Sequence, residues 1–264
     1  RRSPITFNGI NLDLHSIIVG TTGSGKTILS ERIIYDSLIQ NKTVVFIDPK
    51  GSLDTRDRLD SMASNFNRKF YSVSSFGNTD KDISLKLFER ASVDQVKNAL
   101  MKTLDWSEQF YMNASKSGLE KVLNSVFSGE LDLDDIVQGL KDLGDDQVMG
   151  ALHQLKDVCS SDLYQLINGE NKKSIADLRE ENAVVYIGLS SLGYPDVTKT
   201  LGKLLTYNFA YHAARVENRD ISPKEDVQII FDEFVSIGTE DIVHLANKTR
   251  SSGLTLAIAI QCIS

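Results

Sequence analysis

The chain has 264 residues, of which 41% are hydrophobic and 25% are charged, a balance typical of a soluble globular protein. Its apolar runs are all shorter than the roughly 18 residues that a membrane-spanning helix needs, and its two cysteines are too few for a disulfide framework. The net charge of −7 gives no reason to expect a globally basic, nucleic-acid-binding surface.

Six short apolar runs, rich in β-branched residues, predict strands that are buried on both faces. Because these runs do not alternate polar with apolar residues, they favour a mainly parallel sheet that is covered by helices. The expected strands are Ser16–Gly20, Thr43–Asp48, Lys69–Ser74, Ala183–Leu189, Val227–Glu233 and Thr255–Gln261, and amphipathic helices are expected at Lys26–Ile39 and Asp196–Val216.

The segment between the third and fourth expected strands is acidic and has helical spacing throughout. Residues 91–178 hold 15 acidic residues and 8 lysines, a net charge of −7, so the rest of the chain is neutral. Helices are expected here at Val93–Leu104, Ser115–Phe127, Leu133–Leu143 and Gln147–Ile167. We therefore predict an α/β core formed by residues 1–88 and 174–264, with an all-helical insertion at residues 89–173. The acidic insertion either docks a protein partner or is an ordinary solvated surface.

One glycine-rich segment carries the complete phosphate-binding pattern between an expected strand and an expected helix. Glycines at 23 and 25 let backbone N–H groups curl around phosphates, and the positive end of the following helix faces the same anions. Lys26 supplies a point charge at the β/γ bridge, and the Thr27 hydroxyl can hold Mg²⁺. The predicted nucleotide-binding residues are Gly20, Thr21, Thr22, Gly23, Ser24, Gly25, Lys26 and Thr27.

Two of the expected strands end in acidic residues. Hydrolysis needs one carboxylate near Mg²⁺ and a second that orients or deprotonates water. Asp232 and Glu233 supply both, so we assign the metal to Asp232 and water activation to Glu233. Asp48, which Pro49 and Lys50 follow, is predicted to help bind the nucleotide; for Asp48 alone, an acidic strand end at a solvated turn is an equally weighted alternative.

Two other classes of P-loop enzyme fit the sequence poorly. Guanine-specific enzymes carry Asn-Lys-x-Asp, whereas the segment that starts at Asn247 ends in Arg250 where the base-reading carboxylate must be. Small-molecule kinases clamp the transferred phosphate with lid arginines, and the expected insertion contains no arginine between Arg90 and Arg179. The nucleotide is therefore expected to be ATP with Mg²⁺, and the enzyme an ATPase.

The order of these motifs resembles the TraD/TraG coupling proteins of conjugation and type IV secretion, which belong with the FtsK/HerA translocases. The resemblance spans nearly the whole chain and implies a RecA-like P-loop NTPase core with an inserted all-helical subdomain. It rests on the phosphate loop, Phe46-Ile47-Asp48-Pro49-Lys50-Gly51, the helical insertion, Phe231-Asp232-Glu233-Phe234 and the final strand that ends in Gln261, with a weaker match at Asp105-Trp106-Ser107-Glu108-Gln109-Phe110-Tyr111.

The resemblance implies a ring, typically a hexamer, that binds nucleotide between subunits and passes DNA through its pore. Gln261 matches the family's γ-phosphate-sensing glutamine, and Arg250 matches the arginine that reaches a neighbour's site; bland alternatives are a turn partner for Gln261 and a solvated or ion-paired surface group for Arg250. Further implied partners are a relaxase or other secretion substrate, channel components and a membrane. The chain starts near its first strand and stops after its last, so we expect a cytoplasmic domain of a bacterial inner-membrane protein, anchored by segments outside this chain.

Three functions stay open at this point. The first is a DNA-translocating motor that delivers substrates to a conjugation or secretion channel. The second is a nucleotide-gated docking platform with little motor activity. The third is a chromosomal translocase of the FtsK/HerA type. The intact set of Lys26, Asp232 and Glu233 favours a motor over a platform, because a platform does not need a water-activating carboxylate.

Overall fold

In the computed structural model, six strands form one sheet in the order β1-β8-β7-β2-β6-β3, and every ladder between them is parallel. The strands are β1 (Ser16–Gly20), β2 (Thr43–Asp48), β3 (Phe70–Val73), β6 (Val184–Gly188), β7 (Val227–Phe231) and β8 (Leu254–Gln261). The structure describes residues 13–21, 23–76, 79–106, 109–223, 225–232, 242, 245–246 and 249–261, without the side chains of residues 110, 111, 250 and 261. The predicted mainly parallel sheet is therefore confirmed, with strand bounds shifted by a few residues.

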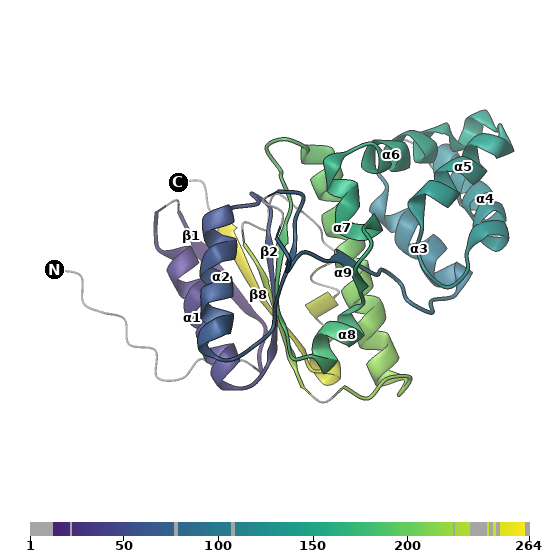
Figure 1. Ribbon diagram of the computed structural model, residues 1–264. Helices are drawn as coiled ribbons and strands as arrows, with labels where there is room; N and C mark the ends of the chain where they lie inside the picture. Colours follow the sequence, from purple (N-terminus) through teal and green to yellow (C-terminus); the bar gives the residue numbers. More distant parts are fainter. Residues whose placement is uncertain are drawn as a thin grey trace.

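Helices cover both faces of the sheet (Figure 1). Helices α1 (Lys26–Ile39) and α2 (Leu53–Asn65) pack on one face, where Ile33, Ile34 and Leu59 join the inward side chains of the strands. Helices α8 (Ile175–Glu180) and α9 (Pro195–Glu217) lie on the other side, where Leu204 and Phe209 of α9 are fully buried. All six residues of β2 are buried, as the continuous apolar pattern predicts for a covered strand.

Helix α2 was not predicted, because its sequence has no clear apolar stripe. Its buried residues are Leu59 and Ala63. The helix is defined instead by its start: the Ser52 hydroxyl caps it by accepting the Thr55 N–H, and Asp54 lies in the positive first turn. Local capping therefore fixes an element that periodicity does not reveal.

The acidic segment is helical, as predicted, with three differences in detail. Its helices are α3 (Val93–Thr103), α4 (Gln109–Val126), α5 (Leu133–Leu143), α6 (Met149–Cys159) and α7 (Gln165–Asn168). Helix α4 begins earlier than expected, at Gln109. The stretch predicted as one helix, Gln147–Ile167, is interrupted at Ser160 and Ser161, where the Ser161 hydroxyl donates to the Val158 carbonyl. Two short strands that were not predicted, β4 (Ser84–Leu85) and β5 (Lys172–Lys173), precede and follow these helices in the sequence. They pair with each other in parallel.

The helical segment and the sheet share one hydrophobic cluster. It runs from Val45 and Ile47 of the sheet to Leu119 of α4 and Leu140 of α5. Two glycines allow the helices to pack closely: a Cβ at Gly139 would lie 2.5 Å from Val122, and one at Gly118 would lie 2.4 Å from Val148. The division into a core and an insertion at residues 89 and 173 stays a prediction.

Two arginines, the buried Arg179 and the half-buried Arg68, fasten the strands at the edge of the sheet where they begin, which we call the amino edge. Arg179 donates to the carbonyls of Glu225 and Ser252, which precede β7 and β8. Arg68 donates to the carbonyls of Lys42 and Asn182, which precede β2 and β6. Each guanidinium therefore joins two strand starts.

The same edge carries an ion cluster around the Glu181 carboxylate. Lys69 and Lys173 bind this carboxylate at 3.0 and 2.6 Å, and the Tyr71 hydroxyl donates to it. Although its partial burial opposes ionisation, these three donors lower the pKa of Glu181 to about 2. Among the described residues, the helices are too short or too polar to be candidates for crossing a membrane.

Candidate functional site

The opposite edge of the sheet, where the parallel strands end, holds Gly20, Asp48, Asp232 and the backbone of Gln261, whereas Arg250 precedes β8 at the amino edge. The β1–β8 ladder places Gly20 beside Gln261. Asp232 follows β7, and its backbone N–H donates to the Ile47 carbonyl of β2 at 3.0 Å. Because β8 lies between β1 and β7, the phosphate loop and Asp232 are separated by one strand. We call this edge, which also carries Asp48, the carboxyl edge.

The phosphate loop has the backbone geometry that its glycines permit. Gly23 and Gly25 have φ of 72° and 93°, in the left-handed region that is costly for other residues. Ser24 N–H donates to the Thr21 carbonyl at 3.2 Å, which closes the turn. Gly25 is the residue that caps α1, and it has no side chain, so the amide groups of the first turn are accessible to an anion.

Lys26 lies folded over this loop. Its ammonium group donates to the Gly20 carbonyl at 2.9 Å and to the Thr21 carbonyl at 2.8 Å. These bonds keep the positive charge at the mouth of the loop, where phosphate oxygens would be the stronger acceptors. The position and partners of Lys26 therefore suit the predicted phosphate contact.

The carboxylate of Asp48 is buried and hydrogen-bonded, unlike a carboxylate that is open to solvent and free to bind a metal. Its side chain is only 3% exposed, and its Oδ1 accepts the N–H of Lys50 at 2.9 Å. Its Oδ2 accepts the N–H of Ser52 at 2.8 Å and the hydroxyl of Tyr186 at 3.0 Å. Both carboxylate oxygens therefore shape the loop after β2, and the predicted contact of Asp48 with nucleotide stays a prediction.

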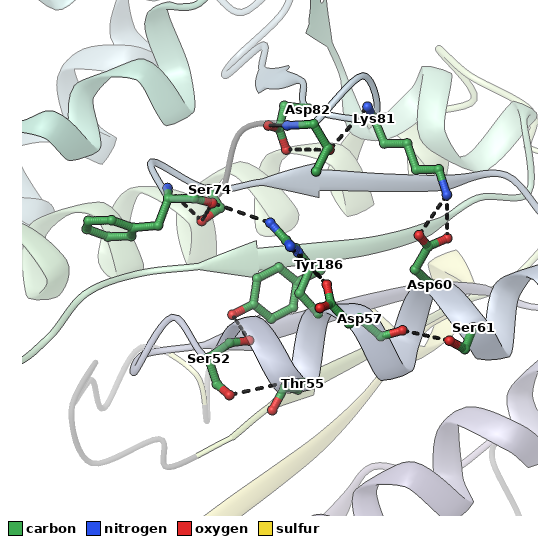
Figure 2. Close-up of polar contacts among 12 residues, drawn as sticks. Ser52, Thr55, Asp57, Asp60, Ser61, Ser74, Lys81, Asp82 and Tyr186 are labelled. Atoms are coloured by element: carbon green, nitrogen blue, oxygen red, sulfur yellow. Dashed lines mark hydrogen bonds and ion pairs between the residues drawn. The ribbon is translucent and has the colours of Figure 1, made fainter.

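Tyr186 is a residue that sequence reasoning missed. It is fully buried on β6, and its hydroxyl lies 3.0 Å from Oδ2 of Asp48. The same hydroxyl lies 3.0 Å from the Ser52 carbonyl (Figure 2). Burial above all, and then the negative charge of Asp48, raise the pKa of Tyr186 far above its usual range, so the phenol remains a proton donor. The sequence carries no local signal of the pair, because 138 positions separate the two residues.

The remaining predicted residues are described only in part. Asp232 is half-buried at the end of β7, while Thr22 and Glu233 lie outside the described residues. Arg250 begins a short 3₁₀ turn, η4 (Arg250–Ser252), directly before β8, but its side chain and that of Gln261 are not among those described. The catalytic roles of Glu233, Arg250 and Gln261 stay predictions.

The described residues include no cluster of three or more His, Cys, Asp or Glu side chains that could hold a metal by themselves. The assignment of Mg²⁺ to Thr27, at the start of α1, and to Asp232, which follows β7, stays a prediction.

Three basic side chains on or beside α2 are ion-paired. Arg58 is paired with Glu31 at 3.0 Å, and Arg56 is paired with Asp57 at 2.9 Å. Lys81 binds the Asp60 carboxylate of α2 (Figure 2). The positive charges of these three side chains are thus balanced by neighbouring carboxylates.

The predicted Asp105–Tyr111 element lies where the helical segment meets α9. Asp105 accepts hydrogen bonds from Lys199 at 2.7 Å and Lys203 at 2.8 Å, both on α9. These bonds lower the pKa of Asp105. The indole N–H of Trp106 donates to the Met101 carbonyl at 2.7 Å, which fixes the end of α3. The described part of this element therefore ties the helical segment to the sheet-covering helix.

Comparison with known families gives one match: the model of the AAA-like domain matches residues 10–233. No curated protein matches the chain.

Among solved structures, the plasmid coupling protein TrwB in complex with the non-hydrolysable GTP analogue GDPNP has a TM-score of 0.63 at 16% identity, and the match covers 95% of this chain and 64% of that one. TrwB in complex with ADP and Mg²⁺ has a TM-score of 0.63 at 17% identity, with the same coverage. VirB4 of Thermoanaerobacter pseudethanolicus has a TM-score of 0.60 at 12% identity, covering 94% of this chain and 69% of that one. The chain thus shares the fold of these proteins and spans about two thirds of their length.

Proposed function

The chain belongs to the AAA-like domain family, and on that premise we propose that it is the ATP-hydrolysing motor of a coupling protein that moves DNA, with or without attached protein, toward a conjugation or type IV secretion channel. The observation that carries the proposal is the arrangement of residues at the carboxyl edge. There, one strand separates the phosphate loop from Asp232, and the backbone of Gln261 pairs with the first residue of that loop. The fold shared with the coupling protein TrwB supports the assignment to this class of ATPase.

In the proposed reaction, each predicted group has one role. Lys26 and the N-terminal amides of α1 bind the phosphates, and Thr27 and Asp232 would hold Mg²⁺, which would supply positive charge to offset that of the phosphates. Glu233 orients the attacking water. Gln261 senses the γ-phosphate, and Arg250 reaches the site of a neighbouring subunit in a ring. Anchoring to a bacterial inner membrane would be supplied by segments outside this chain.

A docking platform that hydrolyses ATP slowly is the second candidate, and one observation favours it. Arg56, Arg58 and Lys81 near the carboxyl edge and α2 are ion-paired, so they offer little free charge for a DNA backbone. An acidic helical surface would then serve a protein partner.

The test is ATP hydrolysis measured against protein concentration, with and without single-stranded DNA. A rate per subunit that rises with concentration and again with DNA supports a ring-forming motor. A rate that ignores both contradicts the motor and favours the platform.

Arg250→Ala sharpens this test, because an arginine that acts across a subunit interface matters only in the ring. We expect the variant to lose hydrolysis by roughly a thousandfold under conditions where light scattering shows a ring. Normal hydrolysis in a confirmed ring would remove Arg250 from the site.

A further inference from the structure

The loop after β2 rests on a buried pair formed by a carboxylate and a phenol. Asp48 is 3% exposed, and Tyr186 is completely buried. Three hydrogen bonds end on the Asp48 carboxylate: from the Tyr186 hydroxyl and from the N–H groups of Lys50 and Ser52. A buried carboxylate is retained only with such partners, so the loop and the phenol stabilise it together.

Two glycines make this arrangement possible. Gly51 has φ of 70°, which turns the chain back so that the Ser52 N–H can reach Asp48. Gly188 is the ladder partner of Asp48, and a Cβ there would lie 2.9 Å from the ring of Tyr186. The phenol ring therefore occupies space that a larger residue at 188 would take.

The loop is bonded to both neighbouring strand ends. On one side, the N–H of Asp232 donates to the carbonyl of Ile47, the residue before Asp48. On the other side, the N–H of Leu189 donates to the Asp48 carbonyl at 2.8 Å, and the N–H of Ser191 donates to the Pro49 carbonyl at 2.7 Å. A displacement of Asp48 would therefore also displace Asp232.

We propose that Tyr186 is a positioning residue for ATP hydrolysis: by holding the buried carboxylate of Asp48 and the start of α2, it fixes the strand end that carries Asp232. The inference rests on the proposed function, because it assigns the pair a task in that reaction. Asp48 then acts through its backbone and loop, and the Mg²⁺ contact falls to Asp232. Small displacements of such groups have large effects on rate, because the reacting atoms must be held in line.

The direct test compares Tyr186→Phe with Tyr71→Phe. Both changes remove one phenol hydroxyl bonded to a carboxylate, but Tyr71 lies at the amino edge, beside Glu181. For Tyr186→Phe we expect kcat to fall roughly tenfold while KM for ATP changes by less than about twofold, because β7 and β8 separate the phosphate loop from β2. Tyr71→Phe should leave kcat unchanged. Equal kcat values for Tyr186→Phe and the unaltered chain would overturn the proposal.

Asp48→Asn separates positioning from direct metal binding. If Tyr186 acts through Asp48, a variant that carries both Tyr186→Phe and Asp48→Asn should hydrolyse ATP no more slowly than Asp48→Asn alone, because both changes break the same contact. If Asp48 instead binds Mg²⁺, Asp48→Asn should raise the Mg²⁺ concentration needed for half-maximal rate, while Tyr186→Phe should not. That second pattern would overturn the proposal.

Amide hydrogen exchange provides a readout that does not depend on hydrolysis. The N–H groups of Lys50 and Ser52 both donate to Asp48, so Tyr186→Phe should speed their exchange several-fold, while Tyr71→Phe should not. Unchanged exchange would show that the phenol does not hold the loop, whatever the activity. An unaltered chain that binds ATP without hydrolysing it would instead defeat the proposed function, and with it the catalytic task assigned to Tyr186.

Discussion

The two edges of the sheet use their charged residues differently. At the amino edge, the guanidinium groups of Arg68 and Arg179 donate to backbone carbonyls, and Glu181 is surrounded by two lysines and a tyrosine. At the carboxyl edge, glycines shape the loops, and Lys26 is held only by two carbonyls of its own loop among the hydrogen bonds described there. The comparison indicates that the charges at the amino edge fasten the fold, whereas the charge of Lys26 at the carboxyl edge remains exchangeable for a ligand.

The largest expected effect is a loss of ATP hydrolysis caused by a change at the carboxyl edge alone. Lys26→Ala removes the positive charge over the phosphate loop, so we expect ATP hydrolysis to fall to less than about a thousandth, with the melting temperature in the absence of nucleotide almost unchanged. Steady-state hydrolysis and thermal melts of the same preparation check both parts. A large loss of stability would mean that Lys26 also fastens the fold.

The matching change at the amino edge should do the reverse. Arg179→Met leaves the carbonyls of Glu225 and Ser252 without their buried donor, so we expect the free energy of unfolding to fall by about 3 kcal/mol. Below the melting transition, kcat should stay within about twofold of the unaltered chain. Denaturant unfolding and hydrolysis measured side by side provide the check. A lost kcat in fully folded protein would show that the edges are coupled.

The next effect depends on pH. Burial, reinforced by Arg179 and Arg215, lowers the pKa of His212 to about 3, well below its usual value near 6.5. The unfolded chain therefore binds the proton first, so the stabilising contribution is complete above about pH 6.5 and is lost as the pH falls toward 3. Lowering the pH from 7 to 5 should cost about 2 kcal/mol at this residue. His212→Gln should flatten that slope in unfolding experiments; equal slopes would contradict a neutral, buried His212.

The smallest expected effect concerns an exposed charge at the amino edge. Lys69 is paired with Glu181, but its side chain is 63% exposed, so Lys69→Met should change the free energy of unfolding by less than about 0.5 kcal/mol. Lys173 is bonded to the same carboxylate and is less exposed, so Lys173→Met serves as the matched comparison. If Lys69→Met were the more destabilising of the two, burial would not determine how much each ion pair with Glu181 contributes to the free energy of unfolding.

The sequence predicted the sheet well, because a buried parallel strand is recognisable from its own residues. All six strands and the helix at Lys26–Ile39 were predicted, since continuous β-branched runs and a 3.6-residue period are local signals. Helix α2 escaped prediction, because its cap at Ser52 defines it and its apolar face is narrow. The two-residue strands β4 and β5 were missed because strands this short leave no period to detect.

The candidate site was predictable where its residues are adjacent in the chain. The phosphate loop and Asp232 follow strands, and the structure brings both to the carboxyl edge. Tyr186 was not predictable, because its bond to Asp48 depends on which strands become neighbours in the sheet. The same limit applies to Arg179. Its sequence context indicates a helical surface residue, and its buried bonds arise only because α8 lies near the starts of β7 and β8.

The pairing of β1 also determines when the site can form during synthesis. In the described sheet, β1 lies at the end of the strand order and is held by β8, with Ser16 beside Ala257. A ribosome making this chain completes the phosphate loop early but cannot dock its strand until residues 254–261 have emerged. Contacts this distant in sequence close slowly. An emerging chain would thus acquire tight nucleotide binding only after residues 254–261 have been made.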